Sequence, residues 1–133
     1  MRFGLIALMN NIHKKLISII VPCFNSGKTI QRTIESLKNQ TWDHKEIIVV
    51  NDGSNDQDTI DILNKLDGVL IVNQKNLGLS AARNAGAYIA KGRFLFFIDS
   101  DDWIEHNTLE LMFNFSENNS FNKNHYIFSD IVL

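Results

Sequence analysis

The chain has 133 residues, enough for one domain with a hydrophobic core and too few for two domains of ordinary size. Its 13 basic and 15 acidic residues give a net charge of -2, so the composition provides no electrostatic attraction to nucleic acid or to an anionic membrane. A single cysteine excludes an internal disulfide and fits a reducing compartment.

Residues 1–14 precede the first pattern that is typical of a globular fold. We expect them to form an N-terminal extension, with the main domain spanning residues 15–133. The apolar run in this extension, residues 3–9, is much shorter than the roughly 20 residues that a membrane-spanning helix needs. It also lacks the small-residue cleavage site of a secretory signal peptide, so we expect no cleaved signal.

Five apolar runs predict β-strands, and the segments between them have the periodicity of helices. The predicted strands are residues 16–21, 46–50, 69–72, 93–98 and 126–133, and the predicted helices are residues 29–40, 58–66, 80–92 and 106–117. The first four strand runs are continuous, which is typical of strands that helices cover on both faces. Alternating strands and helices predict an α/β fold of three layers, α-β-α, with a mostly parallel, doubly wound sheet.

Polar residues follow each of the first four predicted strands, in the sequences PCFNSG, NDGSND, NQKNLG and DSDDW. Parallel strands bring their carboxyl ends to one edge of the sheet, so the four clusters should meet there. Doubly wound sheets bind their ligands beyond this edge, near the switch in strand order. The sequence therefore predicts a polar binding site at this edge.

The acidic cluster allows two interpretations. In an extended backbone Asp99 and Asp101 point to the same side, and two hard oxygen ligands suit Mg²⁺ or Mn²⁺. Alternatively, the segment is a turn in which an aspartate caps the helix of residues 106–117 or a nearby amide. In either case we expect Asp102 to support the turn rather than a metal ion.

The other clusters also have two interpretations each. Asp52 either accepts a hydrogen bond from a nucleobase or ribose, or belongs to an ordinary turn in which Gly53 has a positive φ. With Ser80 as N-cap, Arg83 falls in the first helical turn and either holds a phosphate or pairs with a surface carboxylate. Phe24 either stacks on a base or is a buried aromatic at a strand end.

Four stretches together resemble the amino-terminal half of family-2 glycosyltransferases with a GT-A fold. They are SIIVPCFNSGKTIQRTIESLKNQTW, EIIVVNDGSND, NLGLSAARNAG and FLFFIDSDDW, in the order and approximate spacing of that family. The resemblance covers residues 16 to about 115. It implies a site for a nucleotide-sugar donor, usually UDP-linked, with Mn²⁺ or Mg²⁺ as the cofactor.

The resemblance also implies roles for individual residues. Around the base and ribose it places Pro22, Phe24 and Asn25, with Asp52 binding the uracil. It places Arg83 near the ribose or diphosphate. Asp99 and Asp101 match the family's Asp-x-Asp motif, in which Asp99 lies towards the ribose and metal and Asp101 is the direct metal ligand.

The function implied is inverting, metal-dependent transfer of a sugar to a saccharide or glycolipid acceptor. In such enzymes the acceptor site and the general base follow the Asp-x-Asp motif. We identify no candidate for the base, because Asp130, whose place in the order fits best, lies in an apolar run. We therefore expect an incomplete chain that works in the cytoplasm, with peripheral association at the inner face of the membrane. The alternative is a non-catalytic remnant that binds a nucleotide or a partner chain. The sequence makes no prediction of the oligomeric state.

Overall fold

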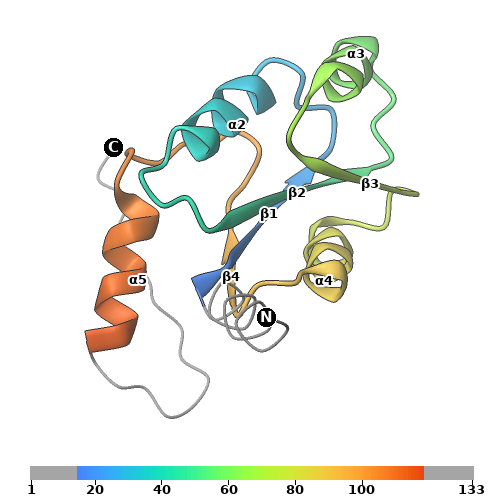
Figure 1. The fold of residues 1–133 in the computed structure, drawn as a ribbon. Coiled ribbons are helices and arrows are strands. Elements are labelled where there is room, and N and C mark those ends of the chain that lie inside the picture. Colours follow the sequence, from blue (N-terminus) through green and yellow to red (C-terminus); the bar gives the residue numbers. More distant parts are fainter. Residues whose placement is uncertain (1–14, 119–133) are drawn as a thin grey trace, which may run out of the picture.

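The computed structural model describes residues 15–118 (Figure 1). The predicted extension of residues 1–14, the predicted strand of residues 126–133 and Asp130 lie outside the described residues. The elements are β1 (Ile17–Cys23), α2 (Ile30–Lys38), β2 (Lys45–Asp52), α3 (Gln57–Lys65), β3 (Leu70–Gln74), α4 (Leu79–Ile89), β4 (Phe94–Phe97) and α5 (Thr108–Asn118).

The four strands form one parallel sheet in the order β3-β2-β1-β4. Helices α2, α3 and α5 pack against one face of the sheet, and α4 packs against the other face (Figure 1). Helices α2, α3 and α4 each return the chain to the start of the next parallel strand, as the alternating pattern of the sequence requires. The predicted three-layer, doubly wound α/β fold is confirmed.

Strand β1 lies inside the sheet, and all seven of its residues are buried. Its neighbours are β2 on one side and β4 on the other. Successive side chains point to opposite faces, so Ile19 and Val21 join the core beneath α2, α3 and α5, whereas Ile20 faces α4. The continuous apolar sequence of β1 follows from this coverage of both faces.

The strand boundaries differ from the predicted ones. β1 continues through Pro22, because the ladder to β4 ends at Ile20 and the missing N–H of Pro22 would point to that side. The expectation that all four strands are covered on both faces is wrong for β3 and β4. These are the outer strands of the described sheet, and they leave Leu70, Leu95 and Phe97 exposed.

Helix α4 also begins and ends elsewhere than predicted. Its N-cap is Gly78, with a φ of 91°, and not Ser80, while its C-cap is Ala90 and not Gly92. Gly92 instead lies against the start of β1, where its amide donates a hydrogen bond of 2.8 Å to the Ser18 hydroxyl. A Cβ atom on Gly92 would lie 2.6 Å from that oxygen, so the close approach requires glycine here.

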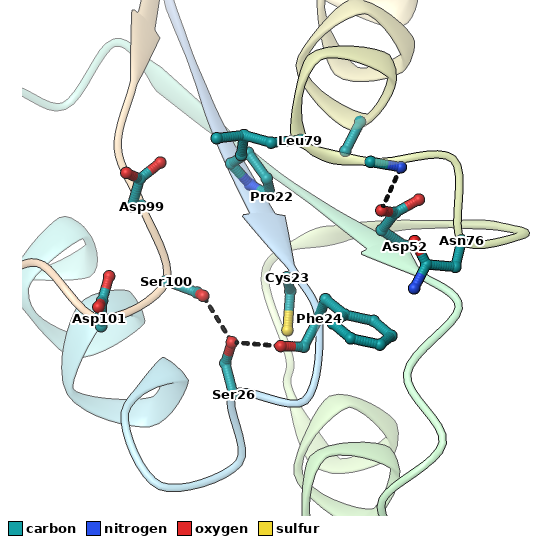
Figure 2. A pocket seen from close by; sticks show the side chains of 12 residues that line it. Pro22, Cys23, Phe24, Ser26, Asp52, Asn76, Leu79, Asp99, Ser100 and Asp101 are labelled. Carbon is teal, nitrogen blue, oxygen red and sulfur yellow. Dashed lines mark hydrogen bonds between the residues drawn. The ribbon is translucent and has the colours of Figure 1, made fainter.

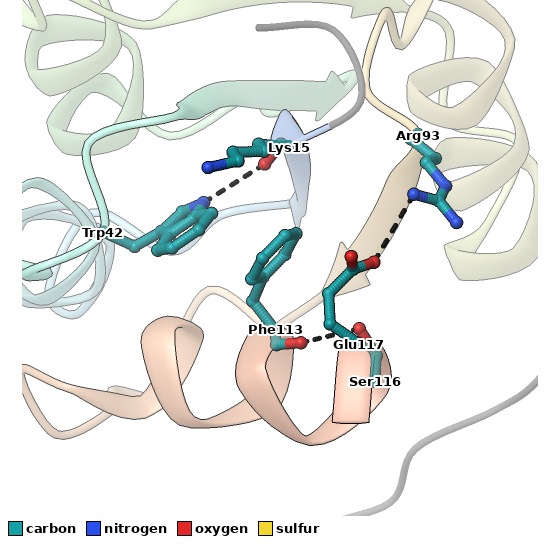
Figure 3. Close-up of polar contacts among 6 residues, drawn as sticks. All are labelled: Lys15, Trp42, Arg93, Phe113, Ser116 and Glu117. Carbon is teal, nitrogen blue, oxygen red and sulfur yellow. Dashed lines mark hydrogen bonds and ion pairs between the residues drawn. The ribbon is translucent and has the colours of Figure 1, made fainter. Parts of the chain in front are cut away.

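Helix α5 is attached to the sheet by aromatic and polar contacts (Figure 3). Trp42 stacks on Phe113 with their ring centroids 4.2 Å apart, and its indole N–H donates to the Lys15 carbonyl at 3.2 Å. At the other end of the helix, Arg93 pairs with Glu117 at 3.4 Å. These contacts hold α5, which follows the acidic segment, against Trp42 and Arg93.

The longest helices, α4 and α5, have 11 residues each. Within residues 15–118, no helix has the length and the apolar character that crossing a membrane requires.

The packing of α4 on the sheet predicts that Gly86→Ala destabilises the protein. A Cβ atom at Gly86 would lie 2.5 Å from Cγ2 of Ile20 and 3.2 Å from Cγ2 of Val50, and both side chains are fully buried. Overpacking of this kind costs about 1–3 kcal/mol. It opposes a gain in helix propensity of about 1 kcal/mol. Because core atoms on two strands are approached at once, we expect a lower urea midpoint.

The matched control is Asn84→Ala, an exposed position in the same helix. This change gains helix propensity without a clash and should leave the midpoint unchanged or higher. If Gly86→Ala raised the midpoint as Asn84→Ala does, the close packing of α4 on β1 and β2 would be contradicted.

Candidate functional site

A pocket of about 410 Å³ lies where β1, β2 and β4 end, on the edge of the sheet at which the order of strands reverses (Figure 2). Its volume is within the range of small-molecule sites. Its lining residues are Pro22, Cys23, Phe24, Ser26, Asp52, Asn76, Gly78, Leu79, Ala82, Asp99, Ser100 and Asp101. The predicted convergence of the polar clusters at one edge is therefore seen, with residues from all four clusters on the pocket wall.

Asp52 is the last residue of β2 and is 4% exposed. Its Oδ1 accepts hydrogen bonds from the Gln74 side chain at 2.6 Å and the Leu77 amide at 2.8 Å, and its Oδ2 accepts from the Gly78 amide at 2.9 Å. Three of about four acceptor positions are therefore used by the end of β3 and the loop before α4, and one position on Oδ2 remains.

The pKa of Asp52 reflects these contacts. Burial alone raises it, but the hydrogen bonds from the Leu77 amide, the Gln74 side chain and the Gly78 amide outweigh burial and hold the pKa below its usual value. Asp52 is therefore a carboxylate at neutral pH. The turn that follows has the predicted form, because Gly53 has a φ of 75°.

Of the two site residues predicted in the loop after β1, Phe24 lines the pocket and Asn25 does not. Phe24 lines the pocket and is 44% exposed, so the interpretation of it as a buried aromatic is wrong. Asn25 is outside the pocket lining. Its side chain accepts from the Asn55 amide and donates to the Asn55 side chain, both at 2.9 Å, which ties the loop after β1 to the loop after β2.

The acidic residues after β4 form a turn, as in the second of the two interpretations, and not the extended backbone of the first. The Asp102 amide donates to the Asp99 carbonyl at 3.1 Å, which closes the turn. Asp99 and Asp101 both line the pocket despite this difference. The predicted capping of the last helix by these aspartates is not observed, because α5 begins only at Thr108.

Arg83 pairs with Asp99, with Nη2 and Oδ1 2.7 Å apart. Arg83 is the fifth residue of α4, because the helix begins at Leu79, so its predicted place in the first turn is wrong. It is not among the residues that line the pocket. The pairing with a carboxylate is the second of the two interpretations of Arg83, and the carboxylate belongs to the acidic turn itself.

The three carboxylates of the turn have different surroundings. Burial, followed by the charges of Asp101 and Asp99, raises the pKa of Asp102. Asp99 is paired with Arg83. The carboxylate of Asp101 is exposed and has no hydrogen-bond or ion-pair partner within residues 15–118. Asp101 is thus the carboxylate of the turn that is open to a ligand.

This donor set fits a magnesium or manganese ion of the kind that a diphosphate brings with it. Such an ion is held by one or two carboxylates, with phosphate oxygens and waters as its other ligands. Asp101, with Asp99 beside it, supplies that number of carboxylates on the pocket wall. A site made by the protein alone is not present in the described part of the chain, where no group of three or more His, Cys, Asp or Glu residues is placed to hold a metal.

Several pocket residues were not singled out from the sequence. Ser26 and Ser100 lie with their hydroxyl oxygens 2.7 Å apart, and Asn76 and Leu79 come from the loop before α4 and its first turn. Their position after a predicted strand could have indicated the loops to which they belong, but it could not have indicated which residue of each loop lines the pocket. Cys23 lines the wall as well, and burial raises the pKa of its thiol, as expected for an unreactive cysteine.

The contacts of Asp52 predict that Asp52→Asn destabilises the protein in a pH-dependent way. An asparagine turns an amide NH₂ towards a backbone or side-chain donor, which leaves at least one hydrogen bond unmade and costs about 1–3 kcal/mol. The pKa of Asp52 is lower in the folded protein than in the unfolded chain. Its contribution is therefore complete above the unfolded pKa of about 3.9 and is lost as the pH falls through the folded pKa.

Urea midpoints measured between pH 7 and pH 3 test this. The difference between the wild type and Asp52→Asn should be widest near neutral pH and should shrink below about pH 4. The control is Asp43→Asn, an exposed carboxylate at the opposite edge of the sheet, before β2. A difference that did not change with pH would contradict a role for the charge of Asp52.

Known proteins share this fold and these motifs. The model of glycosyl transferase family 2 matches residues 18–123. EpsH of Bacillus subtilis is 46% identical over 99 residues, which are 72% of this chain and 29% of that protein. The poly(ribitol-phosphate) beta-N-acetylglucosaminyltransferase TarP of Staphylococcus aureus is 40% identical over 113 residues, which are 80% of this chain and 35% of that protein.

Solved structures of TarS from S. aureus have the same architecture. The structure of its residues 1–349 superposes with a TM-score of 0.69 at 34% identity, covering 77% of this chain and 32% of that one. The same part of TarS has been solved with UDP and with UDP-GlcNAc. The chain spans about a third of the length of these proteins. The match of the family model over most of the chain, with the identities to EpsH and TarP, shows that the chain belongs to glycosyl transferase family 2.

Proposed function

We propose that the chain carries the donor site of a glycosyltransferase that takes a sugar from a nucleotide-diphosphate sugar, UDP-linked, with Mn²⁺ or Mg²⁺. The observation that supports this most is the Asp101 carboxylate, which faces a pocket at the switch in strand order and has no partner in residues 15–118. The complexes of TarS with UDP and UDP-GlcNAc favour uridine as the base.

The base and ribose of the donor would lie between the ends of β1 and β2. Phe24 is exposed on the pocket wall and offers an aromatic face for stacking. Asp52 is held as a carboxylate and keeps one acceptor position for a base N–H. Pro22 lines the same wall. Asn25 would act on the nucleotide through the loop that it fixes, since its side chain is bonded to Asn55.

The diphosphate would lie over the acidic turn. Asp101 would be the direct ligand of the cation, with Asp99 towards the ribose and the same cation. Arg83 is 2.7 Å from Asp99, so it sets the orientation of that carboxylate and leaves Asp101 as the unpaired charge. When bound, the cation would offset the charge that develops on the leaving diphosphate. The residues that this chain supplies bind and orient the donor.

The reaction proposed is transfer with inversion to a saccharide or glycolipid acceptor. A hydroxyl of the acceptor attacks the anomeric carbon, the bond to the diphosphate breaks, and a base takes the hydroxyl proton. No carboxylate of residues 15–118 is assigned as that base. TarP is named as a transferase that acts on poly(ribitol phosphate), so the acceptor of that relative is a polymer. We also propose that this protein transfers sugar in the cytoplasm, at the inner face of the membrane.

A second candidate function is a non-catalytic module that binds a nucleotide or a partner chain. The observation that favours it is the exposure of Leu95 and Phe97 on β4, the outer strand beside β1, at 47% and 43%. An outer strand with exposed apolar side chains is a surface for pairing with another chain. Both functions share the nucleotide site and differ in whether sugar transfer occurs.

The proposal predicts that UDP raises the melting temperature of the chain much more with Mn²⁺ than without it. A ligand at 100 times its dissociation constant stabilises by about 2.7 kcal/mol, which is a rise of several degrees for a domain of this size. Asp101→Asn should remove this Mn²⁺-dependent rise, because the amide cannot replace the carboxylate as a ligand for a hard cation.

Asp43→Asn, at the opposite edge of the sheet, is the control and should keep the full rise. An unchanged rise in Asp101→Asn would show that this carboxylate does not hold the cation. If UDP with Mn²⁺ gave the wild type no rise while the chain melted cooperatively, the donor site itself would be excluded.

A further inference from the structure

Helix α2 has a second buried face that the donor site does not include. Its apolar stripe packs on the sheet, but Thr33, Ser36 and the following Gln40 face the segment that carries the acidic turn, residues 99–107. Thr33 is 1% exposed and Gln40 is 4% exposed. Polar side chains are buried at such positions only when they are hydrogen-bonded, and each of these three is bonded to the backbone of that segment.

The Thr33 hydroxyl contacts the carbonyl groups of both residues that flank Asp101. Its Oγ1 is 2.9 Å from the carbonyl oxygen of Ser100 and 2.7 Å from that of Asp102. The contact with the Thr29 carbonyl within its own helix is longer, at 3.5 Å. The two carbonyl groups of the turn therefore share the single hydroxyl proton more closely than the carbonyl of its own helix, and this holds the backbone on either side of Asp101.

The rest of the segment is held by the other members of this face. The Ile104 amide donates to Ser36 Oγ at 3.4 Å. The Gln40 side chain donates to the Glu105 carbonyl at 2.7 Å and accepts from the Leu109 amide at 3.1 Å, at the start of α5. Hydrogen bonds to α2 and to Gln40 thus hold the backbone from the acidic turn to the start of α5.

We infer that Thr33 is a positioning residue for the cation ligand Asp101. This inference rests on the proposed donor site. The carboxylate of Asp101 has no partner in the described chain, so its direction depends on the backbone that carries it. That backbone is held by the Asp102–Asp99 turn bond, by the Ser26–Ser100 contact and, on both sides of Asp101, by Thr33. Groups that orient a metal ligand affect metal affinity about 10–100-fold.

The experiment compares Thr33→Val with Thr33→Ser in the full chain. Valine keeps the shape and removes the hydroxyl, whereas serine keeps the hydroxyl and removes a methyl group. The quantity measured is the ratio of the UDP dissociation constants without and with Mn²⁺, by calorimetry. We expect this ratio to fall about 10-fold or more in Thr33→Val. It should return to the wild-type value in Thr33→Ser, and UDP affinity without metal should stay unchanged in both.

Thr59→Val is the matched control. Thr59 is fully buried, and its hydroxyl donates to the Asp56 carboxylate at 2.9 Å, at the start of α3 and away from the acidic turn. This variant loses a buried hydroxyl and should keep the wild-type ratio. If Thr59→Val lowered the ratio as much as Thr33→Val, or if Thr33→Val left it unchanged, the inference would be overturned. If Thr33→Val does not melt cooperatively, Thr33→Ala replaces it with the same expected result.

A measurement without ligand separates this inference from the proposed function. Hydrogen exchange of the Asp102 amide, which closes the turn, should become faster in Thr33→Val and return towards the wild-type rate in Thr33→Ser. Unchanged exchange would overturn the positioning of the turn even if UDP binds. Failure of the wild type to bind UDP with Mn²⁺ would instead overturn the proposed function. Thr33 would then hold the turn without orienting a cation ligand.

Discussion

The constraint on which this site depends is the repulsion among three carboxylates within four consecutive residues. Like charges this close raise the free energy of the fold unless other groups take up their field. Each of the three carboxylates has different surroundings in the fold. Asp99 is paired with Arg83, burial and its neighbours raise the pKa of Asp102, and Asp101 faces the pocket. Among residues 15–118, the charge of this turn that remains unpaired is the one on the pocket wall.

The fold supplies the groups that make this arrangement possible. Arg83 reaches Asp99 because α4 lies close to the sheet, and it does so because Gly86 has no side chain to separate the helix from Ile20. The N-cap of the same helix is Gly78, whose amide donates to Asp52. One element therefore joins the acidic turn to the carboxylate at the end of β2, so the two ends of the pocket are held at a fixed separation.

The predictable part of the structure is the part governed by local pattern. Continuous apolar runs identified the four described strands, although only β1 and β2 are largely buried on both faces. The alternation with helices identified the layers. The errors lie where a tertiary contact replaced a local rule. Ser80 has the chemistry of an N-cap, but the Asp52 carboxylate binds the amides before α4, and the helix begins at Leu79. No local pattern contains that carboxylate.

In the site, too, local pattern predicted some features and tertiary contacts determined the others. The acidic residues were found from their position after a strand, but their backbone is a turn and not a strand, because β4 ends at Phe97 and the Asp102 amide turns back to Asp99. The part of Thr33 in that turn left no signal, since a threonine in a helix is ordinary. Its importance depends on two carbonyl groups 67 and 69 residues further along the chain. Contacts of this kind become visible only in three dimensions.

The turn also lies at the border of a sheet face that the described helices leave open. α4 covers Ile20, Ile48, Val50 and Val72 on its face, while Leu95 and Phe97 of β4 remain exposed on the same face. β4 leads directly into Asp99, so any element that covered these two side chains would lie beside the acidic turn. The hydrophobic effect that favours burial of this apolar surface would therefore place such an element next to the pocket.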